Sequence, residues 1–144
     1  MPRYINDIIV HCSATKPDQD WGAAEVTACH QENGWKTCGY HYVVKRDGSV
    51  ERGRAISQPG AHCRGHNAHS IGVCYIGGLD EKGRAADTRT DAQRSALLQL
   101  LAKLTIVYKC RIHGHRDYAA KDCPCFDVHQ EYDNLYRQLA LPKS

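Results

Sequence analysis

The chain has 144 residues, the usual length of a single domain. Its 42% hydrophobic and 24% charged residues are typical of a globular protein and exclude an intrinsically disordered one. The 19 lysines and arginines exceed the 16 aspartates and glutamates by three, and a net charge of +3 is too small for a dedicated nucleic-acid-binding protein. We therefore expect one domain over residues 1–144, with no nucleic acid as partner.

The sequence also bears on the compartment of the protein. No run of 18 apolar residues occurs, so we expect no membrane helix and no membrane partner. The N-terminal segment lacks the features of a signal peptide, which predicts synthesis in the cytoplasm, where the eight cysteines stay reduced. Four disulfides are an alternative, but the cysteine content is low for a disulfide scaffold, and a CxxC pair typical of a zinc finger is missing.

The first part of the chain predicts a strand followed by a helix. Residues 8–10 are apolar and β-branched, as in a buried strand. Asp20 is a candidate cap for a helix that ends near Asn33 and Gly34. The chain therefore begins with an alternation of strand and helix.

A hairpin and a second buried strand are predicted next. Residues 40–45 alternate as in a strand, and the turn at 46–49 leads into a return strand at 50–52. Residues 58–70 are rich in glycine, histidine and asparagine without any period, which indicates a loop. Residues 71–76 then form another apolar run, as in a buried strand.

The last third predicts two helices around a short strand at 110–113. Thr90 and Gln93 have the spacing of a capping box, and Asp127 and Gln130 can begin the C-terminal helix near residue 127, which ends near Leu139. Strands that alternate with helices predict an α/β fold with a mixed central sheet flanked by helices. The first of these two helices carries an apolar stripe at helical spacing: Leu97, Leu98, Leu101, Leu104 and Val107.

Three residues are candidates for a metal site. His11 follows the first strand, His115 follows the last strand, and Cys123 lies in a loop eight residues later. Two imidazoles and one thiolate would leave the fourth zinc position open for water, which is the catalytic arrangement. Spacing alone does not decide this, since one buried histidine with two solvated residues would give the same pattern.

Seven segments together carry a resemblance to a known family. They resemble the type 2 N-acetylmuramoyl-L-alanine amidases, which include amidase-type phage lysozymes and the peptidoglycan recognition proteins. The match runs in the family's order from about residue 8 to 126, and it implies a fold like that of the peptidoglycan recognition proteins. The segments are VHCSAT at 10–15, GYHY at 39–42, KRDG at 45–48, GHN at 65–67, SIGVC at 70–74, GHRD at 114–117 and KDCP at 121–124.

The resemblance implies a ligand set and a cofactor. His11, His115 and Cys123 would bind one Zn²⁺ per chain, and the whole chain would be a zinc amidase catalytic domain. Cys125 departs from the family, because a small neutral residue is usual there. A second thiol so close to the ligand leaves open which sulfur coordinates.

The resemblance also implies roles for other residues. Tyr40 and Lys121 match active-site residues, and His62 and Asn67 match positions that line the substrate groove. Each has a simpler alternative, as an ordinary strand tyrosine, a solvated lysine or an exposed loop residue. Four further histidines are assigned no role: His30, His41, His113 and His129.

The function implied is hydrolysis of the amide between the lactyl group of N-acetylmuramic acid and L-alanine in bacterial peptidoglycan. Because a cytoplasmic hydrolase does not reach the wall unaided, we expect a phage or prophage endolysin, a monomer that acts on the cell wall after release.

Two alternatives stay open. One is a non-catalytic module that binds peptidoglycan or regulates an RNA polymerase as a partner, and the other is a thiol hydrolase that uses Cys12 or Cys74. Both cysteines lie on predicted strands, which favours core positions over nucleophiles.

Overall fold

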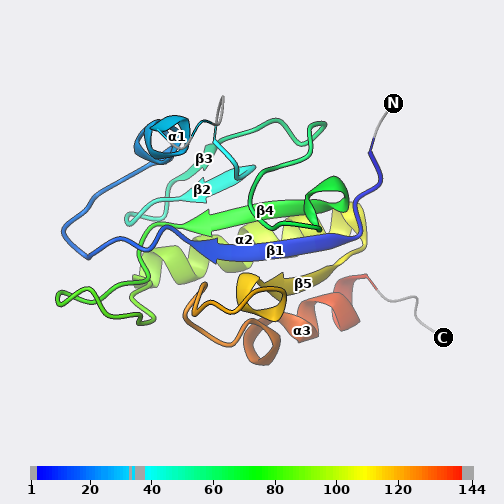
Figure 1. Ribbon diagram of the computed structural model, residues 1–144. Helices are drawn as coiled ribbons and strands as arrows, with labels where there is room; N and C mark the ends of the chain where they lie inside the picture. The colour runs from blue at the N-terminus through cyan, green and yellow to red at the C-terminus, as the bar shows by residue number, and fades with distance from the viewer. Residues whose placement is uncertain (1–2, 33, 35–37, 141–144) are drawn as a thin grey trace.

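Five strands form one sheet in the computed structural model, which describes residues 3–32, 34 and 38–140. Two longer helices and one shorter helix accompany the sheet (Figure 1). The elements in chain order are β1 (Asp7–Cys12), α1 (Ala23–Glu32), β2 (Tyr42–Val44), β3 (Val50–Arg52), η1 (Asn67–His69), β4 (Ser70–Tyr75), α2 (Asp91–Tyr108), β5 (Arg111–Gly114), η2 (His115–Asp117) and α3 (Val128–Leu139).

The sheet is mixed, as predicted, with the strand order β3-β2-β4-β1-β5. The pairs β2·β4, β4·β1 and β1·β5 are parallel, and only the edge strand β3 is antiparallel to its neighbour β2. The carboxyl ends of four strands therefore lie at one edge of the sheet, where ligand sites of open α/β sheets are usually found.

The two faces of β1 have different surroundings. Ile8, Val10 and Cys12 belong to the main hydrophobic cluster, together with residues of α2 and α3. Since side chains alternate along a strand, Ile9 and His11 point to the opposite face. Figure 1 shows α2 and α3 on one side of the sheet. On the opposite face, Val26 of α1 packs with Val43 of β2 and with Ile76, so α1 and the connecting loops cover that side.

Two predicted helix starts are confirmed. Thr90 caps α2 with the full capping box, in which its hydroxyl accepts from the backbone amide of Gln93 and the Gln93 side chain accepts from the backbone amide of Thr90. Asp127 caps α3 through the amide of Gln130. The sequence indicates both caps because each cap and the amide it binds are three residues apart.

The predicted cap of the first helix is wrong. The helix begins at Ala23, three residues after Asp20, and its first amides are bound by glutamates instead. Gly22 donates to the Glu25 carboxylate at 3.1 Å, and Ala23 donates to the Glu51 carboxylate of β3 at 2.8 Å. Glu51 is 28 residues from Ala23 in the sequence, so no local sequence pattern indicates that it binds the first amide of the helix. The predicted helix end at Asn33 lies outside the described residues.

The apolar stripe of α2 is only partly buried. Leu97, Leu101 and Leu104 are in the core, whereas Leu98 is 48% exposed and Val107 is 59% exposed. Leu98 follows Leu97 and is rotated by roughly 100° around the helix, so both cannot face the sheet.

The strand predicted over residues 40–45 is shorter in the structure, since only Tyr42–Val44 pairs in β2.

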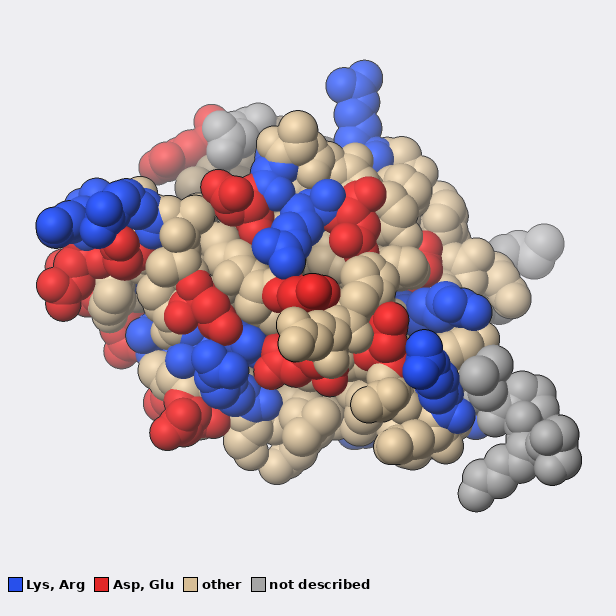
Figure 2. Space-filling view, turned by 90° about the horizontal axis from the view of Figure 1, so that it is seen from below, with Lys and Arg blue, Asp and Glu red and all other residues tan. Residues whose placement is uncertain are grey.

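All eight cysteines are free thiols, and Cys12 and Cys74 are buried, as predicted. The buried cysteines are Cys12, Cys38, Cys63, Cys74 and Cys110. Among the described residues, no helix has both the length and the apolarity of a membrane span. On the face shown in Figure 2, acidic and basic side chains are interspersed, so neither sign dominates that side.

Candidate active site

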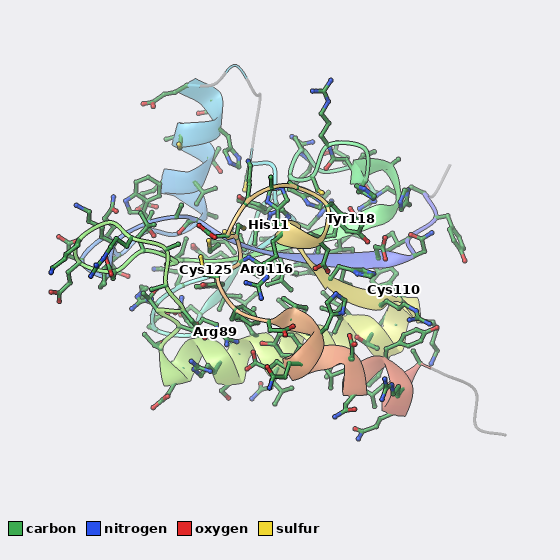
Figure 3. The ribbon with its side chains drawn as sticks, turned by 60° about the horizontal axis from the view of Figure 1, so that its bottom comes forward. His11, Arg89, Cys110, Arg116, Tyr118 and Cys125 are labelled. Atoms are coloured by element: carbon green, nitrogen blue, oxygen red, sulfur yellow. The ribbon has the colours of Figure 1, made fainter. Side chains whose placement is uncertain are left out.

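The parallel pairing of β1 and β5 brings two of the predicted ligands together. Val10 pairs with Gly114, so His11, the next residue of β1, lies beside His115, which follows the end of β5. Their ring centroids are 4.5 Å apart. Figure 3 shows His11 beside the segment that follows β5, which carries Arg116 and Tyr118.

Cys123 completes this group. Its sulfur and one ring nitrogen each from His11 and His115 all lie within 4.8 Å of one another. The backbone amide of Cys12 donates to the Cys123 sulfur at 3.1 Å, which holds the thiol at the end of β1. The neighbouring Cys125 sulfur turns elsewhere, 3.9 Å from the sulfur of Cys12. The fold therefore directs Cys123, rather than Cys125, toward the imidazoles.

A chain of hydrogen bonds assigns the tautomer of His11. The Ser70 hydroxyl donates its only proton to the carbonyl of His66 at 2.7 Å, so at 3.3 Å it accepts from Nε2 of His62. Nδ1 of His62 then accepts from Nε2 of His11 at 2.8 Å. Nδ1 of His11 is left with a free lone pair. Metal-bound histidines are held in this way through their other nitrogen.

The His62 imidazole can take this position because the β4 residue that it packs against is a glycine. A Cβ on Gly72 of β4 would lie 2.6 Å from Cδ2 of His62, closer than real atoms approach. The missing side chain lets the imidazole pack flat against the sheet.

Burial keeps the histidines of the site neutral. It lowers the pKa of His11 well below its ordinary value, and the neighbouring imidazoles of His62 and His115 and the charge of Lys121 lower it further. The pKa of His62 falls to about 3, mainly through burial. The pKa of His115 is lowered by burial and by the nearby charge of Lys121. Unprotonated nitrogens are the form that a metal ion requires.

A groove of about 490 Å³ opens above these residues. The Tyr40 ring lies 5.0 Å from the His11 ring, and burial raises the pKa of its hydroxyl well above the ordinary value. The exposed Lys121 lines the same groove. The groove is lined by His30, Tyr40, Ala61, His62, Cys63, Arg64, Gly65, Asn67, His115, Tyr118, Ala119 and Lys121.

Asn67 has a structural contact in addition to its place in the groove. Its side-chain oxygen accepts from the backbone amides of His62 and Cys63 at 2.9 and 3.0 Å, which fixes the loop that carries His62.

The sequence did not indicate Ser70 or Tyr118 as site residues. Tyr118 follows η2 and lines the groove, whereas Ser70, at the first position of β4, is buried behind it and contacts His62.

The structure disfavours a thiol nucleophile. Cys12 and Cys74 are both buried in strands. The pKa of the Cys12 thiol is raised by its contact with Cys123 and by burial, and burial raises that of Cys74 well above its ordinary value. Such thiols are not deprotonated near neutral pH, and the thiolate is the nucleophile.

His41, beside the site, makes the fold sensitive to acid. Its Nδ1 accepts from the Gly72 amide at 3.0 Å, and its Nε2 donates to the Gln58 carbonyl at 2.8 Å. Arg3 Nη2 lies 3.0 Å from the same Nε2. Burial is the main reason that the pKa of His41 is lowered to about 4. A proton on Nδ1 would break the bond with Gly72.

We predict that the chain loses up to about 3 kcal/mol of stability through His41 as pH falls from 6.5 towards 4. The folded pKa lies below the unfolded one, so this stability is complete above pH 6.5. Urea unfolding at several pH values measures it. His41→Asn, which keeps an acceptor for Gly72, should lower stability at pH 7 but reduce the acid-dependent loss. An unchanged pH dependence in this variant would contradict the assignment.

The family model for N-acetylmuramoyl-L-alanine amidase matches residues 1–126. An endolysin of Enterobacteria phage T3 is 47% identical over 122 residues, which cover 84% of this chain and 81% of that protein. Amidase LysC from Clostridium intestinale URNW has a TM-score of 0.78 at 23% identity, over 97% of this chain and 88% of its own.

Drosophila PGRP-LB also has this fold, with a TM-score of 0.72 at 23% identity, over 86% of this chain and 76% of that one. At 23% sequence identity, these two solved structures show a similarity of fold alone. The family model and the phage relative span most of the sequence, and the family model includes all seven segments noted above. The chain therefore belongs to the N-acetylmuramoyl-L-alanine amidase family and is itself an amidase.

Proposed function

We propose that this amidase uses one zinc ion, held by His11, His115 and Cys123, to cleave the amide between the lactyl group of N-acetylmuramic acid and L-alanine in peptidoglycan. The observation that carries the proposal is the approach of their three ligand atoms to within 4.8 Å of one another. Together with the groove residues they would make the chain a single catalytic domain.

The residues fit a zinc ion. Two neutral nitrogens and one sulfur are ligands that zinc prefers, and three protein ligands are typical of a catalytic site. The free lone pair on Nδ1 of His11, fixed through His62, supplies a donor that needs no proton loss. When bound, zinc supplies Lewis-acid polarisation of a carbonyl and a water nucleophile at neutral pH.

Two groove residues would stabilise the charge that develops on the amide oxygen. Lys121 presents an ammonium group at the groove. Tyr40 keeps its proton because burial raises its pKa, so its hydroxyl acts as a hydrogen-bond donor rather than a base. Donors aimed at a developing oxyanion are among the largest contributions to catalysis.

His62 and Asn67 support the groove in different ways. His62 fixes His11 and lines the groove wall, and Asn67 holds the backbone of the His62 loop. We propose that both also border the bound glycan or stem peptide. Cytoplasmic synthesis followed by release to the cell wall, as for a phage endolysin, suits this activity.

The experiment is digestion of purified peptidoglycan by the metal-loaded protein. We expect release of stem peptides with new L-alanine amino groups and no new reducing sugar ends. A chelator should abolish the release and zinc should restore it. Reducing ends would indicate a glycosidase, activity that survives the chelator would favour a thiol enzyme, and bound zinc without release would favour a binding module. An RNA polymerase partner and a monomeric state stay predictions.

A further inference from the structure

A second group of metal-ligating side chains lies outside the catalytic ligand set. His113, Asp117 and His129 each offer a ligand atom, and these three atoms lie within 4.8 Å of one another. We propose that they form a second metal site, for a first-row transition ion such as zinc, separate from His11 and Cys123. This goes beyond the proposed amidase function.

Three elements supply the ligands. His113 lies on β5, Asp117 ends η2, and His129 is in the first turn of α3. Nε2 of His129 is 2.6 Å from Oδ2 of Asp117, and Nδ1 of His113 is 3.5 Å from the same oxygen. Zinc binds nitrogen and oxygen at about 2.0–2.2 Å, so small side-chain shifts suffice to surround an ion.

The remote nitrogens of both histidines are held by carboxylates. Nε2 of His113 is 3.1 Å from Asp7, and Nδ1 of His129 is 2.9 Å from Asp133. A histidine whose other nitrogen bonds a carboxylate has its tautomer and orientation fixed, which is the usual support of a metal ligand. The same support occurring twice, from β1 and from α3, is the second observation for this site.

The charged groups in contact with the two imidazoles are acidic. Three carboxylates, those of Asp7, Asp117 and Asp133, surround the imidazoles, whereas Arg111 and Arg137 line the same pocket as His113, His129 and Asp133. In the part of the chain that the structure describes, no lysine or arginine forms an ion pair with any of them. His113 is 22% exposed and His129 is 42% exposed, so an ion from solvent has access.

The ligand atoms are already close together without an ion. Both ring nitrogens of His129 lie within hydrogen-bond distance of carboxylates, at 2.9 Å from Asp133 and 2.6 Å from Asp117. The 3.5 Å from Nδ1 of His113 to Asp117 is too long for a good hydrogen bond. An ion between Nε2 of His129 and Oδ2 of Asp117 would also engage this His113 nitrogen.

The donor set selects the class of ion. Two imidazoles and a carboxylate suit zinc and its neighbours, whereas calcium and magnesium prefer oxygen alone. The ion would connect β5, η2 and α3, and η2 begins with the catalytic ligand His115. Its expected effect is therefore to stabilise the segment that carries His115.

Cobalt titration of the metal-stripped, full-length protein tests the proposal. We expect about two Co²⁺ ions per chain, of which one gives the sulfur-to-cobalt charge-transfer band of a thiolate site. His129→Gln should reduce binding to about one ion and leave the thiolate band at full intensity. Cys123→Ser should do the reverse, since it removes the band and keeps the second ion.

Two further variants test whether the loss of the second ion is specific to its ligands. His113→Gln should behave like His129→Gln, which guards against an effect of one substitution on folding. His69→Ala disrupts a different group, Asp7, His66 and His69, and should keep both ions. The proposal is overturned if the parent saturates at one ion with a thiolate band, if His129→Gln keeps the second ion, or if His69→Ala loses it.

Zinc-dependent stabilisation gives an independent measure. In Cys123→Ser, added zinc should still raise the midpoint of thermal unfolding, because an ion bound only to the folded state stabilises it. Adding His129→Gln to this variant should remove the shift. A shift that persists in the double variant would contradict the second site, whereas normal metal binding by Cys123→Ser at both sites would contradict the proposed function.

Discussion

Cys123→Ser should lose the catalytic zinc ion, and with it the release of stem peptides from purified cell walls should fall to background. The serine hydroxyl still accepts from the amide of Cys12, as the sulfur does at 3.1 Å, so the loop keeps its anchor. A hydroxyl is not deprotonated near neutral pH, however, and zinc needs a thiolate there. Zinc content and peptide release are the two measurements.

Cys125→Ser is the matched control for this prediction. The Cys125 thiol lies 3.4 Å from the Gly78 carbonyl, and burial together with Cys12 raises its pKa to about 12. We expect this variant to keep its zinc and its activity. Loss of zinc from Cys125→Ser, with zinc retained by Cys123→Ser, would show that the other sulfur coordinates.

Lys121→Ala should lower kcat by about 10²–10³-fold and leave the zinc content unchanged. Lys121 is close enough to lower the pKa of both His11 and His115, so its charge acts on the space above the ligands. An ammonium group there stabilises negative charge on the amide oxygen more in the transition state than in the substrate.

Steady-state kinetics on a soluble muropeptide separate this role from simple binding. Lys121→Arg should recover part of kcat, because it keeps the charge. Lys103→Ala, on α2, should leave kcat unchanged. If Lys121→Ala instead raises KM with kcat unchanged, Lys121 binds substrate and transition state equally and does not act on the oxyanion.

The elements of the fold follow closely from local sequence. The cap at Thr90, the cap at Asp127 and the alternating or apolar strands are recognisable because each depends on residues a few positions apart. The prediction of Asp20 as a helix cap is wrong because the actual partner of the first helix amide is distant in sequence. The helix amide at Ala23 is satisfied by Glu51, whose approach requires the β2–β3 hairpin to be in place.

The residues of the candidate site likewise include some that the sequence indicates and some that it does not. His11 and His115 are recognisable because each comes just after a segment that predicts a strand, and the resemblance to a family singles out Cys123, Tyr40 and Lys121. Nothing local indicates Ser70, which completes the hydrogen bonds that orient His62 and His11.

By itself, the sequence determined the strands and helices, the caps of α2 and α3, and the family. Only the tertiary structure decided which atoms meet. The parallel register of β1 and β5 places His11 beside His115, and the packing of α3 on β5 places His129 beside His113 and Asp117. Secondary structure depends on neighbours within a few residues, whereas these sites depend on contacts between residues that belong to different elements, which chain folding alone creates.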